Sequence, residues 1–236
     1  MQGPRFDIGD GYAFYEGPLD GGGPHGHAAF QIAVGLAGDV AVLDDGGVCH
    51  RGEALLIPPM VRHQMMASSE LRTFFIEPSC VFADRLRARC GPGVTAAPEL
   101  RALGEGRVRA EVAYPSEDLD PRLMAAMDLL VERGAPMAGL AVRVGLSPQR
   151  LRALSRDQLG MPLVRWRSWQ RLSRAAQALR AGRPPAGAAA AGGFADQAHY
   201  TRTMREMMGL TPAAVVPLLC RSGAAGDVHG DRAGDR

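Results

Sequence analysis

The segment 140–212 contains two short glycine turns, each followed directly by the start of a helix. The first turn is Gly145-Leu-Ser-Pro-Gln-Arg-Leu151 and the second is Gly193-Phe-Ala-Asp-Gln197. Each contains a Ser or an Asp that can cap the next helix, because its side-chain oxygen accepts a free backbone N–H group. A helix, a tight turn and a capped helix make up a helix-turn-helix unit. The sequence therefore predicts two such units in tandem.

Helical patterns surround both turns. Asp120-Pro121 predicts a helix that runs to Gly134, and residues 136–144 form the first helix of the first unit. Between the units, residues 163–180 carry apolar side chains at 166, 169, 172, 176 and 179, which is one face of an amphipathic helix. The C-terminal half is therefore expected to be all-α.

Charge divides the chain into two halves. Residues 1–121 hold 10 Arg against 17 Asp and Glu, a net charge of −7. Residues 122–221 hold 15 Arg against 5 acidic residues, a net charge of +10. A basic half that coincides with helix-turn-helix patterns favours double-stranded DNA as its partner.

The second helix of each unit is expected to contact DNA. Leu151 and Leu154 would face inward in the first unit, and Tyr200 and Met204 in the second. Gln and Arg on the outer faces can make bidentate contacts with purine edges in the major groove. The predicted DNA-contacting residues are Ser147, Gln149, Arg150, Arg152, Gln197, His199 and Arg202.

The spacing of the two units suits two successive major grooves. The intervening helix spans roughly 27 Å at about 1.5 Å per residue. With the widths of the flanking helices, the separation approaches the ~34 Å repeat of the groove. A single unit of this kind is often only a packed helical hairpin, but two within a strongly basic segment favour DNA reading.

The N-terminal half is rich in short strands. Residues 29–35, 40–43, 54–57 and 72–76 are β-branched or aromatic runs separated by Gly, Asp or Pro, which indicates a small antiparallel sandwich or barrel. A helical, charged stretch follows at 81–103. We therefore expect domains at 1–103 and 121–221, a linker at 104–120 and a disordered tail at 222–236.

The C-terminal segment closely resembles the DNA-binding domain of the AraC/XylS family of bacterial transcription regulators. The resemblance implies seven helices, with recognition helices that begin near Ser147 and Asp196. It is carried by Leu140-Ala141, Gly145-Leu-Ser-Pro148, Leu151, Leu159-Gly160, Trp166, Arg171-Leu172, Ala175, Leu179, Gly193-Phe194, Asp196-Gln197, Tyr200, Arg202, Gly209 and Thr211-Pro212.

Three positions depart from the family pattern. Pro185-Ala-Gly-Ala188-Ala189 replaces a run with two large apolar anchors, and its glycine costs about 1 kcal/mol in a helix interior. Ser155 stands where the family tends to have phenylalanine, and Val216 stands where it has arginine. We expect the second unit to contribute mostly phosphate contacts, with base reading carried by Gln149 and Arg152.

Two N-terminal motifs look like those of the cupin barrel, which commonly precedes the DNA-binding domain in AraC-type regulators. Gly52 to His63 resembles the second motif, with Met60 in place of a glycine, and His25-Gly-His27 to Gln31 resembles the first, with glutamine in place of glutamate. His25, His27 and His63 are candidate ligands of a Zn, Fe, Ni or Cu ion, with Gln31 as a weak fourth ligand.

The same residues have other interpretations. Regulator cupins tend to keep relics of the motif and to use the barrel as a pocket for an organic effector. In the simplest interpretation, His63 satisfies backbone groups at a strand end and His25 and His27 lie in a mobile loop. The barrel interior would then hold Phe30, Ile32, Val34, Leu56 and Phe75.

The leading hypothesis is a cytoplasmic, sequence-specific transcription regulator controlled by a ligand or interactions at its cupin domain. It would have no catalytic residues, require no cofactor and contact no membrane. A homodimer formed through the barrel or residues 81–103 is expected, with RNA polymerase as a partner if the protein activates. The alternative is a metal-dependent cupin enzyme with a helical appendage, which the neutral Gln31 weakens.

Overall fold

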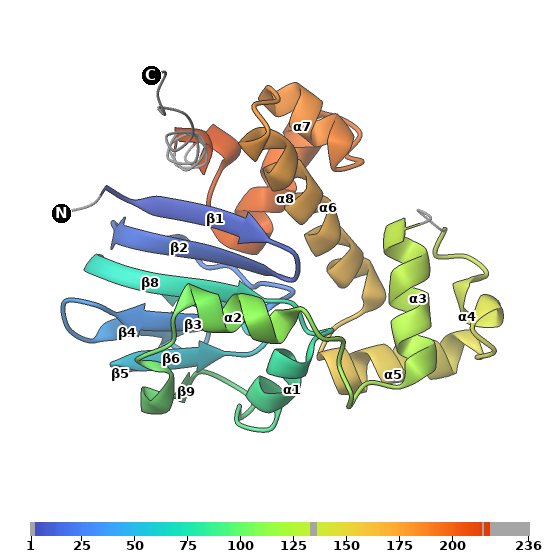
Figure 1. The fold of residues 1–236 in the computed structure, drawn as a ribbon, viewed down its shortest axis with the longest axis horizontal. Coiled ribbons are helices and arrows are strands. Elements are labelled where there is room, and N and C mark those ends of the chain that lie inside the picture. Colours follow the sequence, from blue (N-terminus) through green and yellow to red (C-terminus); the bar gives the residue numbers. More distant parts are fainter. Residues whose placement is uncertain (1–2, 133–135, 214, 218–236) are drawn as a thin grey trace, which may run out of the picture.

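Strands and helices occupy separate parts of the chain, as the sequence predicts. A computed structural model describes residues 3–132, 136–213 and 215–217. The strands lie within the first hundred residues, together with a short α-helix and a 3₁₀ turn, and the described residues after them are helical or irregular (Figure 1). None of the helices in these described ranges is long and apolar enough to cross a membrane. The expected tail at 222–236 lies outside the described residues.

The strands form two antiparallel sheets, which we call the barrel. One sheet has the order β1-β2-β8-β3-β6-β9 and the other has the order β5-β4-β7. The strands are β1 (Arg5–Gly9), β2 (Tyr12–Leu19), β3 (Phe30–Gly35), β4 (Val40–Asp44), β5 (Cys49–Gly52), β6 (Ala54–Ile57), β7 (His63–Met65), β8 (Ser68–Ile76) and β9 (Thr95–Ala96). The four predicted strand runs correspond to β3, β4, β6 and β8.

Both faces of the larger sheet are buried, so its side chains contribute to separate apolar clusters on the two faces. Phe30, Ile32 and Val34 share one apolar cluster with Phe82 and Val108 outside the barrel. Ala33, Leu55 and Ile57 point the other way and join Val40 and Met65 of the smaller sheet. Successive side chains alternate across a strand.

The expected barrel interior of Phe30, Ile32, Val34 and Leu56 is therefore wrong. These four side chains face the helices that cover the sheet. Phe75 does lie on the opposite face, where it packs with the C-terminal helices. The apolar run in β3 could not show which face points inward, because both faces are covered.

The stretch 81–120 differs from its sequence expectation. Residues 81–103 contain α1 (Val81–Arg87), strand β9 and a 3₁₀ turn (Pro98–Leu100) rather than continuous helix. The expected linker at 104–120 contains α2 (Glu105–Val112). Val108 and Val112, four apart, are buried against the sheet, and Arg109 pairs with Glu105 one turn away.

The C-terminal helices follow the predicted order, but the first helix of the first unit begins at Leu140 and ends at Arg143 rather than spanning 136–144. They are α3 (Pro121–Glu132), α4 (Leu140–Arg143), α5 (Pro148–Leu159), α6 (Leu163–Arg180), α7 (Pro185–Ala191) and α8 (Gln197–Met208), and residues 212, 213 and 215–217 are also helical. Ser147 accepts the backbone N–H of Arg150 at 3.2 Å, and Asp196 accepts that of His199 at 2.6 Å. Both predicted N-caps are confirmed.

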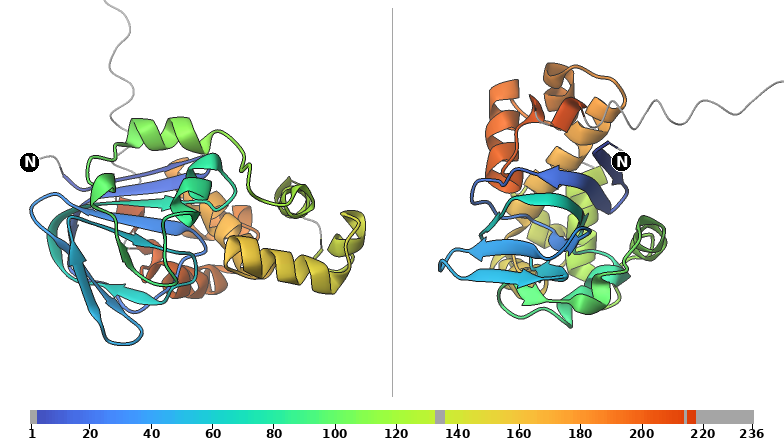
Figure 2. Two further views of the ribbon diagram at one scale, coloured as in Figure 1. Left: turned by 90° about the horizontal axis from the view of Figure 1, so that it is seen from below. Right: turned by 90° about the vertical axis from the view of Figure 1, so that its left-hand side faces the viewer.

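The barrel and the C-terminal helices share one apolar core. Phe6, Ile8 and Phe75 of the barrel pack in one cluster with Trp169 of α6 and Met204 of α8. Arg180, at the end of α6, donates to the Ile8 carbonyl at 2.8 Å and pairs with Asp7 at 2.7 Å. Helices α1 and α2 lie on a different side of the strands from α6 to α8 (Figure 2). The two halves of the chain are therefore docked.

Helix α7 forms despite its glycine, so that glycine is predicted to lower stability. A Cβ atom on Gly187 would make ordinary contacts, the nearest at 3.6 Å from Pro184 Cδ. We expect Gly187→Ala to raise the free energy of unfolding by about 0.5–1 kcal/mol, measured by urea titration.

Gly192, one residue after α7, is the matched control. Its Cβ atom would lie 2.6 Å from the Arg171 carbonyl oxygen and 2.9 Å from the Phe194 ring. Gly192→Ala should lower the free energy of unfolding by about 1–3 kcal/mol, because the Arg171 backbone can move aside only at a cost in free energy. Equal effects of the two substitutions would contradict this account of α7.

Candidate functional site

A close backbone pairing brings the two cupin-like motifs together. His25 and His63 exchange two backbone hydrogen bonds of 2.9 Å each, and the Met60 amide donates to the His27 carbonyl at 2.7 Å. Met60 has φ of 65°, a left-handed conformation that favours glycine. That explains why the resembling motif has glycine here. The bend turns the chain from β6 into β7 and places His63 beside His25.

Three imidazoles and one amide converge inside the barrel, and we call them the histidine cluster. Its members are His25, His27, His63 and Gln31, each at most 4% exposed. Nε2 of His63 lies 2.8 Å from Oε1 of Gln31, and Nε2 of His27 lies 3.0 Å from the same oxygen. Nε2 of His25 lies 3.1 Å from Nε2 of His27. All four predicted residues are thus brought together, and the mobile-loop interpretation of His25 and His27 is wrong.

The backbone sets the protonation of two of these rings. Nδ1 of His25 donates to the Gly23 carbonyl at 2.7 Å, and Nδ1 of His63 donates to the Val61 carbonyl at 2.9 Å. A carbonyl only accepts, so the proton of each neutral ring is on Nδ1 and Nε2 presents a lone pair. Gln31 Nε2 donates to Thr73 Oγ1 at 3.2 Å, which turns Oε1 toward the rings.

Burial keeps the cluster uncharged. Desolvation is the largest effect on each ring: it lowers the pKa of His25, lowers that of His27 well below its usual range and lowers that of His63 to about 4. The neighbouring histidines lower the pKa of His27 and His63 further. At neutral pH the cluster therefore offers neutral imidazoles, the form that binds metal ions.

This donor set fits a divalent cation. The ligand atoms of the three histidines all lie within 4.8 Å of one another. Without a cation, no single arrangement of neutral groups satisfies all three short contacts: a rotated Gln31 amide would donate to Nε2 of His63, but a proton on Nε2 of His27, needed for the contact with His25, would then face the amide N–H group. That proton would also leave Nδ1 of His27 as a buried acceptor, and Nδ1 makes no hydrogen bond with any described residue. A cation would satisfy the converging Nε2 and Oε1 lone pairs together.

A cavity of about 130 Å³ opens beside the histidine cluster. His25, Gln31 and Thr73 supply its polar wall, and barrel side chains such as Phe75 supply apolar wall. Met208, Leu210 and Val215, at and beyond the end of α8, close it from the helical side. A molecule bound there would touch both the barrel and the C-terminal helices.

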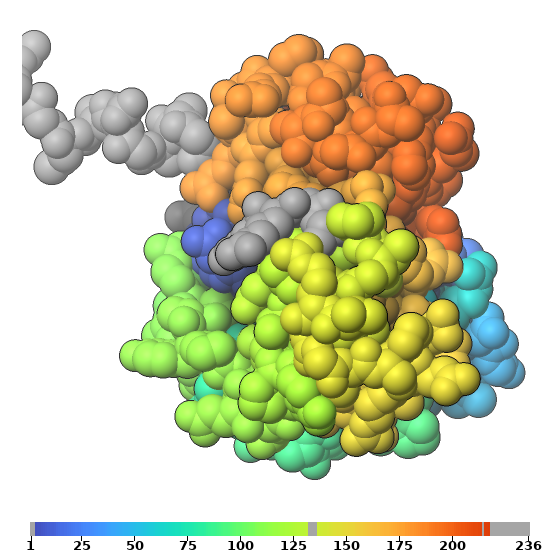
Figure 3. Space-filling model, turned by 90° about the vertical axis from the view of Figure 1, so that its right-hand side faces the viewer, coloured from blue at the N-terminus to red at the C-terminus, as the bar shows by residue number. Residues whose placement is uncertain are grey.

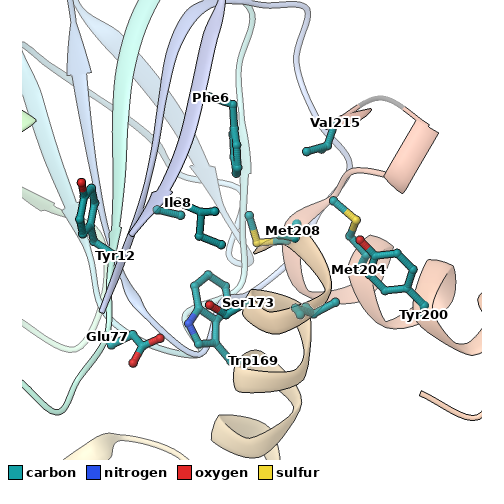
Figure 4. A pocket seen from close by; sticks show the side chains of 13 residues that line it. Phe6, Ile8, Tyr12, Glu77, Trp169, Ser173, Tyr200, Met204, Met208 and Val215 are labelled. Carbon is teal, nitrogen blue, oxygen red and sulfur yellow. The ribbon is translucent and has the colours of Figure 1, made fainter. Parts of the chain in front are cut away.

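A smaller apolar cavity of about 40 Å³ adjoins it between the two halves. Figure 4 shows Trp169 of α6 lying against Ile8 and Met208, with Glu77 at the edge. The Glu77 carboxyl accepts hydrogen bonds from the side chains of Gln170 and Trp169. Burial raises its pKa, and these two hydrogen bonds only partly offset that effect.

The predicted DNA-contacting residues mostly lie at the surface. Ser147, Gln149, Arg150, Arg152, Gln197 and Arg202 are exposed, whereas His199 is half-buried. The His199 ring packs edge-on against Phe194 with centroids 5.3 Å apart, so it is less available than predicted. The two helix-turn-helix units occupy the same face of the molecule (Figure 3).

Two further arginines belong to this surface. Arg156 lies one turn after Arg152 on α5, and Arg205 lies one turn after Arg202 on α8, and both are exposed. Helical spacing of three or four residues is the signal that could have identified them. The hydroxyl oxygen of Ser147 already accepts the hydrogen bond that caps α5, so its expected contribution to DNA contact is secondary.

The first helix-turn-helix unit has a groove beside Ser155, the position at which the AraC/XylS pattern has a phenylalanine. Ser155 is 1% exposed, and its hydroxyl donates to the Met161 carbonyl at 2.5 Å. A groove of about 480 Å³ lies beside it, between α4, α5 and the start of α6. Val142 and Val164 line the groove and are 75% and 54% exposed.

Comparison with known proteins identifies the helical half. Residues 140–216 match the family described as a helix-turn-helix domain. Over 87 residues the chain is 36% identical to the arabinose operon regulatory protein of Escherichia coli (strain K12), a match that covers 36% of this chain and 30% of that protein. The Salmonella typhimurium (strain LT2) protein of the same name is also 36% identical over 87 residues and is covered to 31%. The chain thus spans about a third of the length of these curated relatives. Residues 140–216 form a helix-turn-helix domain of the AraC type.

Solved structures with the same overall fold cover nearly the whole chain. The crystal structure of ToxT from Vibrio cholerae O395 has a TM-score of 0.58 at 12% identity and covers 90% of this chain and 99% of that one. The structure of ToxT bound to an unsaturated fatty acid has a TM-score of 0.59 at 12% identity and covers 94% and 99%. This likeness confirms the two-domain fold, a sheet-rich domain followed by a helical one.

Glu77 at the interface gives a pH prediction. Its folded-state pKa lies above the unfolded value, so ionisation opposes folding and stability falls as pH rises between the two values. Glu77→Gln keeps an acceptor without the charge. We expect it to exceed the parent protein in unfolding free energy at pH 7, with the difference shrinking toward pH 4, measured by urea titration.

The control is Glu70→Gln, at an exposed position on β8, the strand that ends one residue before Glu77. It should leave the pH dependence of stability unchanged. Identical pH profiles for the parent protein and Glu77→Gln would show that the Glu77 carboxyl is not held in a desolvated site.

Proposed function

We propose that this protein is a sequence-specific DNA-binding transcription regulator. The observation that carries the proposal is the AraC-type helix-turn-helix domain at 140–216, with exposed Gln149 and Arg152 on α5. Gln and Arg on a helix that enters the major groove can distinguish purines by paired hydrogen bonds. The net charge of +10 over residues 122–221 adds attraction to phosphates.

The sensor role of the barrel is the second part of the proposal. The cavity of about 130 Å³ is mostly apolar, with His25, Gln31 and Thr73 at one side. It suits a small apolar molecule that carries one polar group. A ToxT structure similar in fold was solved with an unsaturated fatty acid bound. We propose a ligand of that general chemistry here, which acts by binding two states of the protein with different affinity.

A divalent metal ion at the histidine cluster is the third part. His25, His27 and His63 would hold the ion, and Gln31 would supply a neutral oxygen. Bound there, it would supply positive charge and an open coordination position for a ligand in the cavity. Neutral amide oxygen stabilises a divalent cation less than carboxylate does, so affinity is expected to be moderate.

We also propose that the protein acts as a homodimer on its operator. Two chains on one site would increase occupancy through effective concentration. Sedimentation with and without operator DNA measures this, and a strict monomer on DNA would contradict it. Contact with RNA polymerase belongs to the proposal only if the protein activates transcription.

The second candidate function is a metal-dependent enzyme of the barrel, favoured by the metal-like histidine cluster beside a cavity. The AraC-type domain favours a regulator without catalysis. Selection of bound DNA from a random library decides between them. A defined consensus supports the regulator, whereas binding that does not distinguish any sequence from random DNA overturns it.

Arg152 provides a direct test of base reading. Its side chain is exposed on α5, one turn after the helix start. Arg152→Ala should weaken operator binding by about 1–3 kcal/mol and relax the consensus at one position. Fluorescence anisotropy and library selection measure the two effects.

Arg51→Ala, at an exposed site on β5, is the control for loss of one positive charge. It should leave both affinity and consensus unchanged. A full consensus retained by Arg152→Ala would remove Arg152 from the set of base-reading residues.

Metal binding at the cluster has its own prediction. Gln31→Glu would add a carboxylate to the ligand set, and we expect Zn²⁺ affinity to rise at least about tenfold. His63→Ala should abolish stoichiometric Zn²⁺ binding. Isothermal titration of the metal-stripped protein measures both.

Gln64→Glu is the matched control, because its side chain alternates to the other side of β7 from His63. This substitution adds the same charge nearby, but its carboxylate cannot coordinate the metal, so Zn²⁺ affinity should stay nearly unchanged. Equal gains from both glutamates would mean that general charge, rather than ligation, attracts the ion.

A further inference from the structure

The histidine cluster is closed on one side by the DNA-binding domain. Gly209, the C-cap of α8, packs so tightly that a Cβ atom on it would lie 2.8 Å from Nδ1 of His25. The Trp169 ring of α6 lies edge-on to the His27 ring with centroids 6.3 Å apart. The barrel alone therefore does not enclose its own cluster.

The last turn of α8 lies beside the third ring of the cluster. Barrel carbonyls hold His25 and His63, as described above. For His27, the nearby backbone acceptor is the carbonyl of Met207, in the last turn of α8, although Nδ1 of His27 makes no hydrogen bond with any described residue. An acceptor on that side favours a proton on Nδ1, which leaves Nε2 as a lone pair facing Gln31.

The end of α8 also brings negative partial charge to the cluster. The last carbonyls of a helix have no partner within it and form the negative end of its dipole. The Arg205 carbonyl accepts the Gly209 amide, and the Met207 carbonyl lies near His27. A cation held by the three imidazoles would be attracted to this helix end.

We propose that α8 completes the metal site, so that a divalent transition metal in the histidine cluster and the docking of α8 on the barrel stabilise each other. Because the linkage is reciprocal, an ion that binds more tightly when α8 is docked must hold α8 down by the same free energy. A role of this linkage in regulation rests on the proposed function, in which α8 is the second helix that contacts DNA. The linkage itself does not.

Hydrogen exchange of the full chain with and without Zn²⁺ tests the proposal on the parent protein. Zn²⁺ at saturation should slow exchange of the amides in residues 204–209 by about tenfold or more. Amides of α5 provide the internal control and should be unaffected. In His63→Ala, whose substitution lies on β7 away from α8, the Zn²⁺ effect should vanish.

A pair of glycine variants tests the contact itself. Gly209 and Gly182 both end helices with positive φ, 66° and 80°, so alanine strains both backbones alike. Only Gly209 faces His25, whereas Gly182 has open space around it. We expect Gly209→Ala to weaken Zn²⁺ binding by about tenfold or more and Gly182→Ala to leave it within about twofold.

Two results would overturn the linkage: no stoichiometric Zn²⁺ binding, or stoichiometric binding with unchanged exchange in residues 204–209. Equal Zn²⁺ affinities for the two glycine variants would count against the contact through Gly209. Operator binding by the metal-free protein is measured separately. Its failure would refute the proposed regulator, while a positive exchange result would leave the metal linkage standing.

Discussion

The structure depends on a single apolar interface between the barrel and helices α6 and α8. Phe6, Ile8 and Phe75 on one side and Trp169 and Met204 on the other belong to one continuous core. Burial of that much aromatic and aliphatic surface is strongly favourable, at about 25 cal/mol per Å². It fixes α8 against the opening of the barrel. Both the cavity beside the histidine cluster and the closure of that cluster follow from this contact.

The histidine cluster places unusual chemistry at that interface. Three neutral imidazoles and a neutral amide point lone pairs at one another in a desolvated space. Such an arrangement is favourable only when a proton or a cation relieves it. Gly209 packs against His25 and the Met207 carbonyl lies near His27, so the proposed binding of a cation in the cluster would also stabilise the docking of α8. A regulator could use this as its coupling between sensing and DNA reading.

Local patterns predicted the elements that local forces decide. Ser147 and Asp196 cap α5 and α8 as expected, since capping needs only neighbouring residues. The bounds of α6 follow from the 3.6-residue period of its apolar face. The spacing of His25, His27, Gln31 and His63 predicted their meeting through resemblance to the cupin motifs. Helix α2 was missed because its short, charged sequence shows only Val108 and Val112 as apolar signals.

The sequence by itself determined the two-domain order, the helix-turn-helix units and the set of residues in the cluster. Each of these features depends on the spacing and type of residues within a short segment of the sequence. Only the tertiary structure decided that Phe30, Ile32 and Val34 pack against α1 and α2 on the outside of the barrel. It also decided that the helical domain docks on the barrel and that the end of α8 covers the histidine cluster. The first outcome depends on which face of a sheet that is buried on both sides packs against which partner. The others depend on contacts between residues far apart in the sequence, such as His25 and Gly209, and neither local sequence pattern reveals such a contact.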